Sequence, residues 1–145
     1  MPNPRYLVYP NYENETGEPT VELLRKMEKA KEVYHKNLDR FCNEWHFDIN
    51  EMSHIEGVYL IGSHATEKKW DNDTSDLDLK LVNPCALPMW LHLYKKNVLD
   101  PQLNGGKEKK RWIDLFFARE EYQVLPPRWN LTDYWIKLGR DKNLL

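Results

Sequence analysis

The stretch that decides the fold is residues 57–82, GVYLIGSHATEKKWDNDTSDLDLKLV. It begins with a continuous apolar run at 57–61, which is typical of a buried strand, and Gly62 and Ser63 end that run. A polar segment follows. From 76 to 81 leucines alternate with charged residues, which is the period of a strand with one buried face. The stretch therefore predicts two strands joined by a polar loop.

The segments on either side supply helices and a third long strand. Apolar residues recur every seven positions through Met27, Tyr34 and Phe41, which predicts an amphipathic helix. In chain order, the predicted elements outside the first stretch are a short strand at 5–9, a helix from 20 to about 45, a helix at 86–98, a strand at 112–118 and a helix at 131–138. This order predicts an α/β fold, a small mixed β-sheet packed with helices that cover most of it.

Length and composition indicate one globular domain. The 145 residues suffice for one hydrophobic core, and the six tryptophans and eight tyrosines exclude a disordered chain, which would lack them. We expect a single domain over 1–145, with a core at about 20–118 and a C-terminal tail at 119–145.

Charge and cysteine content exclude several classes of protein. The net charge of −2 argues against a protein that coats nucleic acid by bulk charge, although it is compatible with a local basic patch. No apolar run has the length of a membrane span, and residues 1–10 lack the apolar centre of a signal peptide. We therefore expect a cytoplasmic protein without a membrane partner. Cys42 and Cys85 match no zinc spacing and are expected to be thiols, with a disulfide as the alternative.

Three carboxylates stand out because apolar residues flank them in the predicted strands. Asp76 and Asp78 are two residues apart and project from one strand face, and Asp114 lies in the run at 112–118. Burying a carboxylate costs free energy unless it is paired or bound to metal. Magnesium fits such a group, because it takes a few carboxylates and keeps positions open for phosphates. The three residues are the predicted metal ligands.

Gly62 and Ser63 are the predicted phosphate-binding residues. Glycine lets the backbone come close to a phosphate, and serine supplies a hydroxyl and a backbone N–H. Lys68 and Lys69 follow in the polar segment, where they either reach triphosphate oxygens or are simply solvated. A carboxylate metal site beside a phosphate cradle predicts phosphoryl-type transfer.

These motifs together resemble the polymerase-beta-type nucleotidyltransferase superfamily, whose signature is an apolar residue with Gly-Ser, then Asp-x-Asp, then a later Asp. The matching residues are Ile61-Gly62-Ser63, Asp76-Leu77-Asp78-Leu79 and Ile113-Asp114-Leu115. The likeness spans roughly 56–118 and is strongest to the minimal nucleotidyltransferases, which are small single catalytic domains. Twelve residues, 64–75, separate the serine from the first aspartate, slightly more than usual, and the common second glycine near Glu67 is missing.

The resemblance implies a palm-like nucleotidyltransferase domain that transfers a nucleoside monophosphate, in particular AMP from ATP, to a hydroxyl acceptor. It implies that Gly62 and Ser63 hold the triphosphate and that Asp76 and Asp78 bind two Mg²⁺ ions. Asp114 would complete one metal site and help deprotonate the acceptor, so that all three aspartates are catalytic. ATP or another nucleoside triphosphate is the implied substrate, and a helical partner toxin of a two-gene system is an implied acceptor.

Several alternatives stay open from the sequence. An RNA or tRNA end and a small molecule such as an aminoglycoside are the other acceptors, and a silent module that binds nucleotide or a partner is the contrasting class. Each motif alone also has a structural interpretation: a turn that ends a strand, an exposed strand face, or a paired carboxylate. Aromatic residues of the tail either form a partner interface or pack onto the core; they are Tyr122, Trp129, Tyr134 and Trp135.

Overall fold

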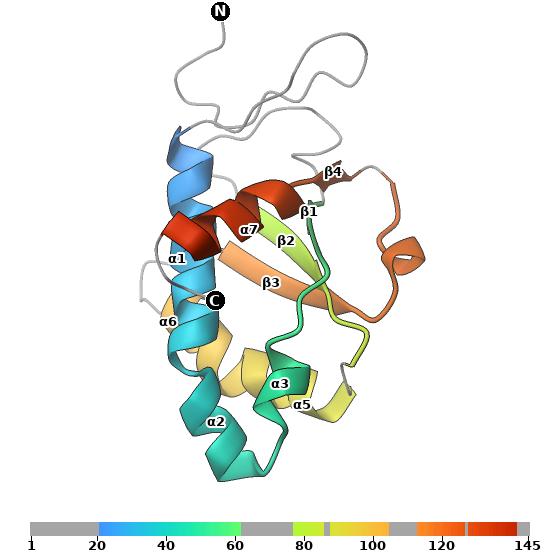
Figure 1. The fold of residues 1–145 in the computed structure, drawn as a ribbon. Helices are drawn as coiled ribbons and strands as arrows, with labels where there is room; N and C mark the ends of the chain where they lie inside the picture. Colours follow the sequence, from blue (N-terminus) through green and yellow to red (C-terminus); the bar gives the residue numbers. More distant parts are fainter. Residues whose placement is uncertain (1–20, 62–76, 86–87, 105–112, 127, 142–145) are drawn as a thin grey trace, which may run out of the picture.

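A computed structural model of the chain describes residues 21–61, 77–85, 88–104, 113–126 and 128–141 (Figure 1). Its longer helices and strands, in chain order, are α1 (Val21–Lys36), α2 (Leu38–Trp45), α3 (Ile49–Met52), β1 (Gly57–Leu60), β2 (Leu77–Val82), α5 (Pro88–Tyr94), α6 (Asp100–Asn104), β3 (Ile113–Ala118), β4 (Trp129–Asn130) and α7 (Thr132–Asp141). The α/β class and the mixed sheet predicted from the sequence are confirmed. The strand predicted at 5–9 lies outside the described residues.

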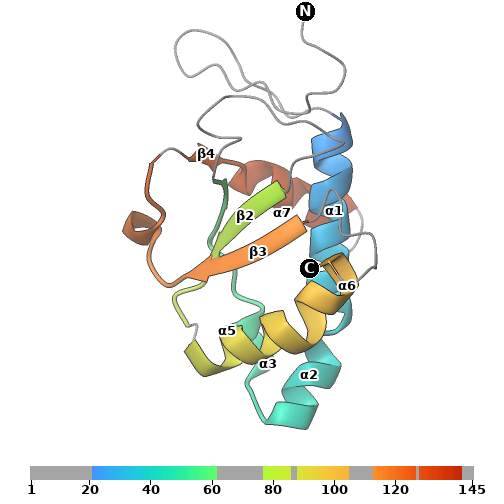
Figure 2. The same ribbon diagram turned by 180° about the vertical axis from the view of Figure 1, so that it is seen from behind.

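The four strands form one mixed sheet in the order β3-β2-β1-β4. Strand β1 pairs antiparallel with β2 and with β4, whereas β2 and β3 are parallel and lie side by side (Figure 2). A parallel pair needs a long crossover connection. That connection is helical and runs through α5, a π-turn at Lys95–Leu99 and α6.

The first predicted helix is interrupted, contrary to the single helix expected from 20 to about 45. Asn37 separates α1 from α2. Its side-chain amide donates to the carbonyl oxygen of Val33, 2.8 Å away, and to Gln102 Oε1 at 3.1 Å. A side chain that bonds the carbonyl four residues back competes with the regular helical ladder. The predicted end near residue 45 is confirmed, because α2 ends at Trp45 and His46 follows with a left-handed φ of 60°.

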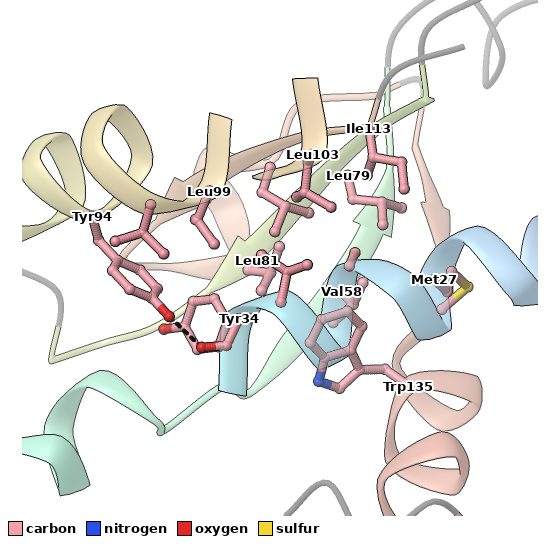
Figure 3. Close-up of a cluster of buried hydrophobic side chains, with 14 of the residues drawn as sticks. Met27, Tyr34, Val58, Leu79, Leu81, Tyr94, Leu99, Leu103, Ile113 and Trp135 are labelled. Carbon is pink, nitrogen blue, oxygen red and sulfur yellow. Dashed lines mark hydrogen bonds between the residues drawn. The ribbon is translucent and has the colours of Figure 1, made fainter. Parts of the chain in front are cut away.

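The hydrophobic core lies between one face of the sheet and the helices. Leu79 and Leu81 of β2 are fully buried against Met27 and Tyr34 of α1. Figure 3 shows these side chains together with those of the crossover and of α7; from the crossover and α7 come Tyr94, Leu99, Leu103 and Trp135. Because every odd residue of β2 from 77 to 81 points into this core, the even residues face the other way.

Two tyrosine hydroxyls tie the helical layer together. Tyr94 donates to the carbonyl oxygen of Tyr34, and Tyr34 donates to that of Met52 in α3 (Figure 3 shows the first bond). Burial raises the pKa of both phenols well above the usual value, so both are neutral donors. The side chain of Asn83 also holds α3, donating to the carbonyl oxygen of Glu51 at 2.9 Å.

The second face of the sheet carries a small apolar cluster and partly exposed polar residues. Val124 packs on it at one end, against Tyr59 and Val82. At the other end Asp78 and Asp114 are partly exposed. Among the described residues, α1, α7 and the crossover pack on the opposite face, and the face that carries Asp78 and Asp114 is called the open face below.

The tail packs onto the core rather than forming a separate surface. Trp135 is 3% exposed, and Trp129 and Tyr134 are partly buried against the same core. Tyr122 differs, with 76% of its surface exposed. Thr132 Oγ1 accepts a bond from the backbone N–H of Val58 at 3.0 Å, which fixes the start of α7 to strand β1.

Candidate functional site

Asp78 and Asp114 lie side by side on neighbouring parallel strands. They are direct partners in the register of β2 and β3. Partners in a parallel pair point to the same face, and neighbouring strands are about 5 Å apart. Both aspartates belong to the face opposite the helices, and both are partly exposed. Two carboxylates predicted from distant motifs are thus brought together at one place.

The orientation of these carboxylates follows from packing on the other face. Leu77 and Leu79 flank Asp78 and are fully buried, while Ile113 and Leu115 flank Asp114 and are 5% and 1% exposed. Since side chains alternate between the faces of a strand, burying the flanking residues turns each aspartate outward. A shift of one residue in either strand would bury a carboxylate in the core, so the apolar residues also fix the site.

The end of β1 is attached to the same place. The backbone N–H of Ile61 donates to the carbonyl oxygen of Asp78, at 3.0 Å. Gly62 and Ser63 come directly after Ile61 in the sequence. Gly62, Ser63, Lys68 and Lys69 themselves lie outside the described residues, as does Asp76.

The described part of the site offers two of the three predicted metal ligands, Asp78 and Asp114, and their chemistry suits a divalent cation. Two neighbouring carboxylates repel each other, and a divalent cation between them relieves that repulsion. Carboxylate oxygens are the ligands that Mg²⁺ takes in proteins, with waters and phosphates completing its shell. Over the described ranges, no cluster of three or more His, Cys, Asp or Glu side chains is placed to hold a metal ion.

Lys80 and Phe116 neighbour the carboxylate pair and are absent from the predicted site residues. They are register partners two positions after Asp78 and Asp114 on the same strands. The period of two that turns Asp78 outward also turns Lys80 outward, so the signal is present in the sequence. Phe116 gives no such signal, because its apolar run reads as buried although 36% of its surface is exposed.

A cavity of about 260 Å³ lies on the same face, at the far end of the strands. Its lining is mostly polar and comes from Glu56, Gly57, Tyr59, Val82, Arg119, Glu120 and Glu121. The Tyr59 hydroxyl donates to Glu121 Oε1 at 2.5 Å, and burial raises the pKa of this phenol. A smaller cavity of about 180 Å³ lies between α2 and the π-turn. Neither lining includes Asp78 or Asp114.

Two basic side chains of α1 lie away from the carboxylates, with Lys31 buried and His35 half-buried. Lys31 is 3% exposed, and its Nζ lies 4.5 Å from the ring centroid of Trp135. Burial lowers the pKa of Lys31 to about 8. Burial, and then the nearby Lys31 charge, lowers the pKa of His35 to about 4. Lys31 thus contributes to the packing between α1 and α7.

No family model matches the chain, and no curated protein or solved structure matches it significantly. Among the described residues, no helix has the length and apolar character needed to cross a membrane.

Proposed function

We propose that the chain is a metal-dependent nucleotidyltransferase, which transfers a nucleoside monophosphate, AMP from ATP, to a hydroxyl acceptor and releases pyrophosphate. The observation that carries the proposal is the register pairing of Asp78 with Asp114 on the open face of the sheet. The resemblance joins these two residues through motifs that are far apart in the sequence. The resemblance requires these two aspartates to lie next to each other. A different order of strands in the sheet would have kept them apart.

The strand connections also support the proposal. The Asp-x-Asp motif enters β2, and the later aspartate lies in β3, its parallel neighbour across a helical crossover. The Gly-Ser motif follows β1, the antiparallel neighbour on the other side. The strands that precede or carry the three motifs are thus neighbours in one sheet, which suits a reaction that needs a triphosphate, metal ions and an acceptor at one point.

Each residue has a proposed role. Asp76 and Asp78 would hold two Mg²⁺ ions, and Asp114 would complete one of the two metal sites. Bound Mg²⁺ supplies charge stabilisation for the triphosphate and its leaving pyrophosphate. Gly62 and Ser63 hold the phosphates through backbone N–H groups and the serine hydroxyl, and Lys68 and Lys69 neutralise phosphate charge. Asp114 orients the acceptor hydroxyl and accepts its proton.

The acceptor classes implied by the resemblance are a partner protein, in particular a helical toxin, an RNA end, and a small molecule such as an aminoglycoside. A cytoplasmic location is part of the proposal, since the proposed enzyme uses a nucleoside triphosphate as its substrate and Mg²⁺ as its cofactor.

The test is incubation of the purified chain with ATP labelled at the α-phosphate, with Mg²⁺, and separately with the product of the neighbouring gene, with total tRNA and with aminoglycosides. We expect label on one acceptor and release of pyrophosphate, both lost in Asp78→Asn and in Asp114→Asn. Glu44→Gln, an exposed charge change on α2, is the control and should keep full activity. If no acceptor is labelled with any of the four nucleotides, a silent binding module replaces the enzyme.

A further inference from the structure

A row of cations and aromatic rings crosses the open face of the sheet beside the carboxylate pair. Tyr59 of β1, Lys80 of β2 and Phe116 of β3 are register partners in this row. At one end the guanidinium carbon of Arg128 lies 4.8 Å from the ring centroid of Tyr59. At the other end Lys95 Nζ lies 4.6 Å from that of Phe116. Three cations thus alternate with two rings, an order that no single stretch of sequence contains.

The outer cations of this row are held in place, whereas the central one is not. Lys95 Nζ is 3.1 Å from Asp100 Oδ1 and donates to the carbonyl oxygen of Leu115 at the same distance. Arg128 is 3.6 Å from Glu121 Oε1. Within the part of the chain that the structure describes, Lys80 makes no ion pair, so its positive charge is the uncompensated one in the row.

The row lies on a definite side of the carboxylates. Along β2 and β3 it follows Asp78 and Asp114 by two residues, which is about 7 Å. Strand β1 runs away from the row toward Ile61, which bonds to Asp78, and Gly62 and Ser63 come next in the sequence. If the donor triphosphate is held next to Gly62 and Ser63, the row is on the side from which an acceptor reaches Asp114.

The chemistry of the row selects the acceptor. A free ammonium group beside an exposed ring is suited to a phosphate with an adjacent base, because the charge attracts the backbone and the ring offers a stacking surface. A neutral protein surface gains little binding free energy from the charge of Lys80. A nucleic-acid strand gains more, because each of its nucleotides carries a negatively charged phosphate. Phe116, 36% exposed next to Lys80, supplies the ring.

We infer that Lys80 and Phe116 bind the terminal nucleotides of a single-stranded nucleic acid, whose 3′ hydroxyl is then the acceptor at Asp114. This inference rests on the proposed function for the identity of the acceptor, but the binding itself needs neither metal nor catalysis. A partner protein as acceptor is the competing outcome. A second competing outcome is that Lys80 binds a phosphate of the donor triphosphate rather than a phosphate of the nucleic acid.

The experiment measures fluorescence anisotropy of a labelled oligoadenylate of about eight nucleotides, with the full-length chain, in EDTA and without nucleoside triphosphate. Lys80→Gln should weaken binding about five- to tenfold and lower the slope of log affinity against log salt by about 0.7, the value for one phosphate contact. Lys80→Arg should restore both. Phe116→Leu should weaken binding by at least fivefold with little change in slope, since stacking carries no charge.

Matched controls change the same chemistry elsewhere. Lys137→Gln removes an exposed charge from α7, and Tyr122→Leu removes an exposed ring from the turn after β3; both should bind as the natural chain does. Asp114→Asn, which abolishes the proposed transfer, should keep or strengthen binding. Failure of transfer and failure of binding are therefore separable. Circular dichroism melts establish that each variant is folded.

Three results would overturn the inference. The first is that Lys80→Gln binds the oligonucleotide with the same affinity as the control variant Lys137→Gln. Lys80→Gln could instead weaken the stabilisation by ATP with Mg²⁺ while leaving oligonucleotide binding unchanged, which assigns Lys80 to the donor. A partner protein could be labelled at the same rate by the natural chain and by Lys80→Gln, with no label on any RNA.

Discussion

Replacing Asp114 with asparagine keeps the shape of the side chain and removes one of two negative charges at the site. Unit charges about 5 Å apart repel by about 3 kcal/mol at an effective dielectric constant of 20. Because Asp78 and Asp114 are partly exposed, solvent screening reduces this to about 1 kcal/mol. Metal removes that cost, so we expect Mg²⁺ with ATP to raise the melting temperature of the natural chain more than that of Asp114→Asn.

The size of the increase follows from mass action. A ligand that binds only the folded chain adds about 3 kcal/mol of stability at a hundred times its dissociation constant. Mg²⁺ with ATP should therefore raise the melting temperature of the natural chain by several degrees and leave Asp114→Asn almost unchanged. The assay is thermal denaturation of both proteins in EDTA and in Mg²⁺ with ATP, with Glu44→Gln as the control for loss of an exposed charge.

The reasoning is wrong if Asp114→Asn keeps the full increase in melting temperature with Mg²⁺ and ATP. That result would mean that the two carboxylates do not share a metal ion.

Three further predictions concern the scaffold. His35 has a pKa of about 4 in the folded chain against 6.5 for an ordinary histidine, so its contribution is complete above pH 6.5 and is lost as the pH falls toward 4. Denaturation in urea should show the stability advantage of the natural chain over His35→Gln falling by up to about 3 kcal/mol between pH 7 and pH 4, whereas a constant difference would contradict the lowered pKa. Asn83→Ala should cost about 2 to 4 kcal/mol in the same assay, because it removes the bond to Glu51 and the one that Cys85 donates. Leu79→Ala should cost about 3 kcal/mol, while Leu125→Ala, at a residue 72% exposed, should cost under about 0.5 kcal/mol.

The strands of the site could be predicted because their pattern is local. The leucines at 77, 79 and 81 fix which face of β2 is buried, and that alone turns Asp78 outward. The sequence also placed Asp114 in a strand. What it could not give by physics alone is the register, since β2 and β3 are joined only after a crossover of some thirty residues. There the resemblance supplied the expectation that the two aspartates meet.

The errors come from contacts between distant residues. The break at Asn37 depends partly on Gln102, which no local pattern around residue 37 reveals. The crossover helix continues past the predicted end at 98 to Asn104, through a π-turn in which Lys95 bonds to Asp100 and β3. Strand β4 has only two residues, which are too few for a periodic signal in the sequence. It is defined by its pairing with β1.

The row that includes Lys80 and Phe116 was missed for the same reason. Its five members come from five separate segments, and only the sheet register and the crossover bring them together.

The most direct test of a shared metal site is a crystal of the natural chain grown with Mn²⁺ and a non-hydrolysable ATP analogue, measured for anomalous scattering. The proposed function predicts a manganese peak within about 2.3 Å of carboxylate oxygens of both Asp78 and Asp114, in contact with the triphosphate. The same crystal of Asp78→Asn should lack it. A bound nucleotide with no metal between these two strands, or manganese held only elsewhere, would contradict the account.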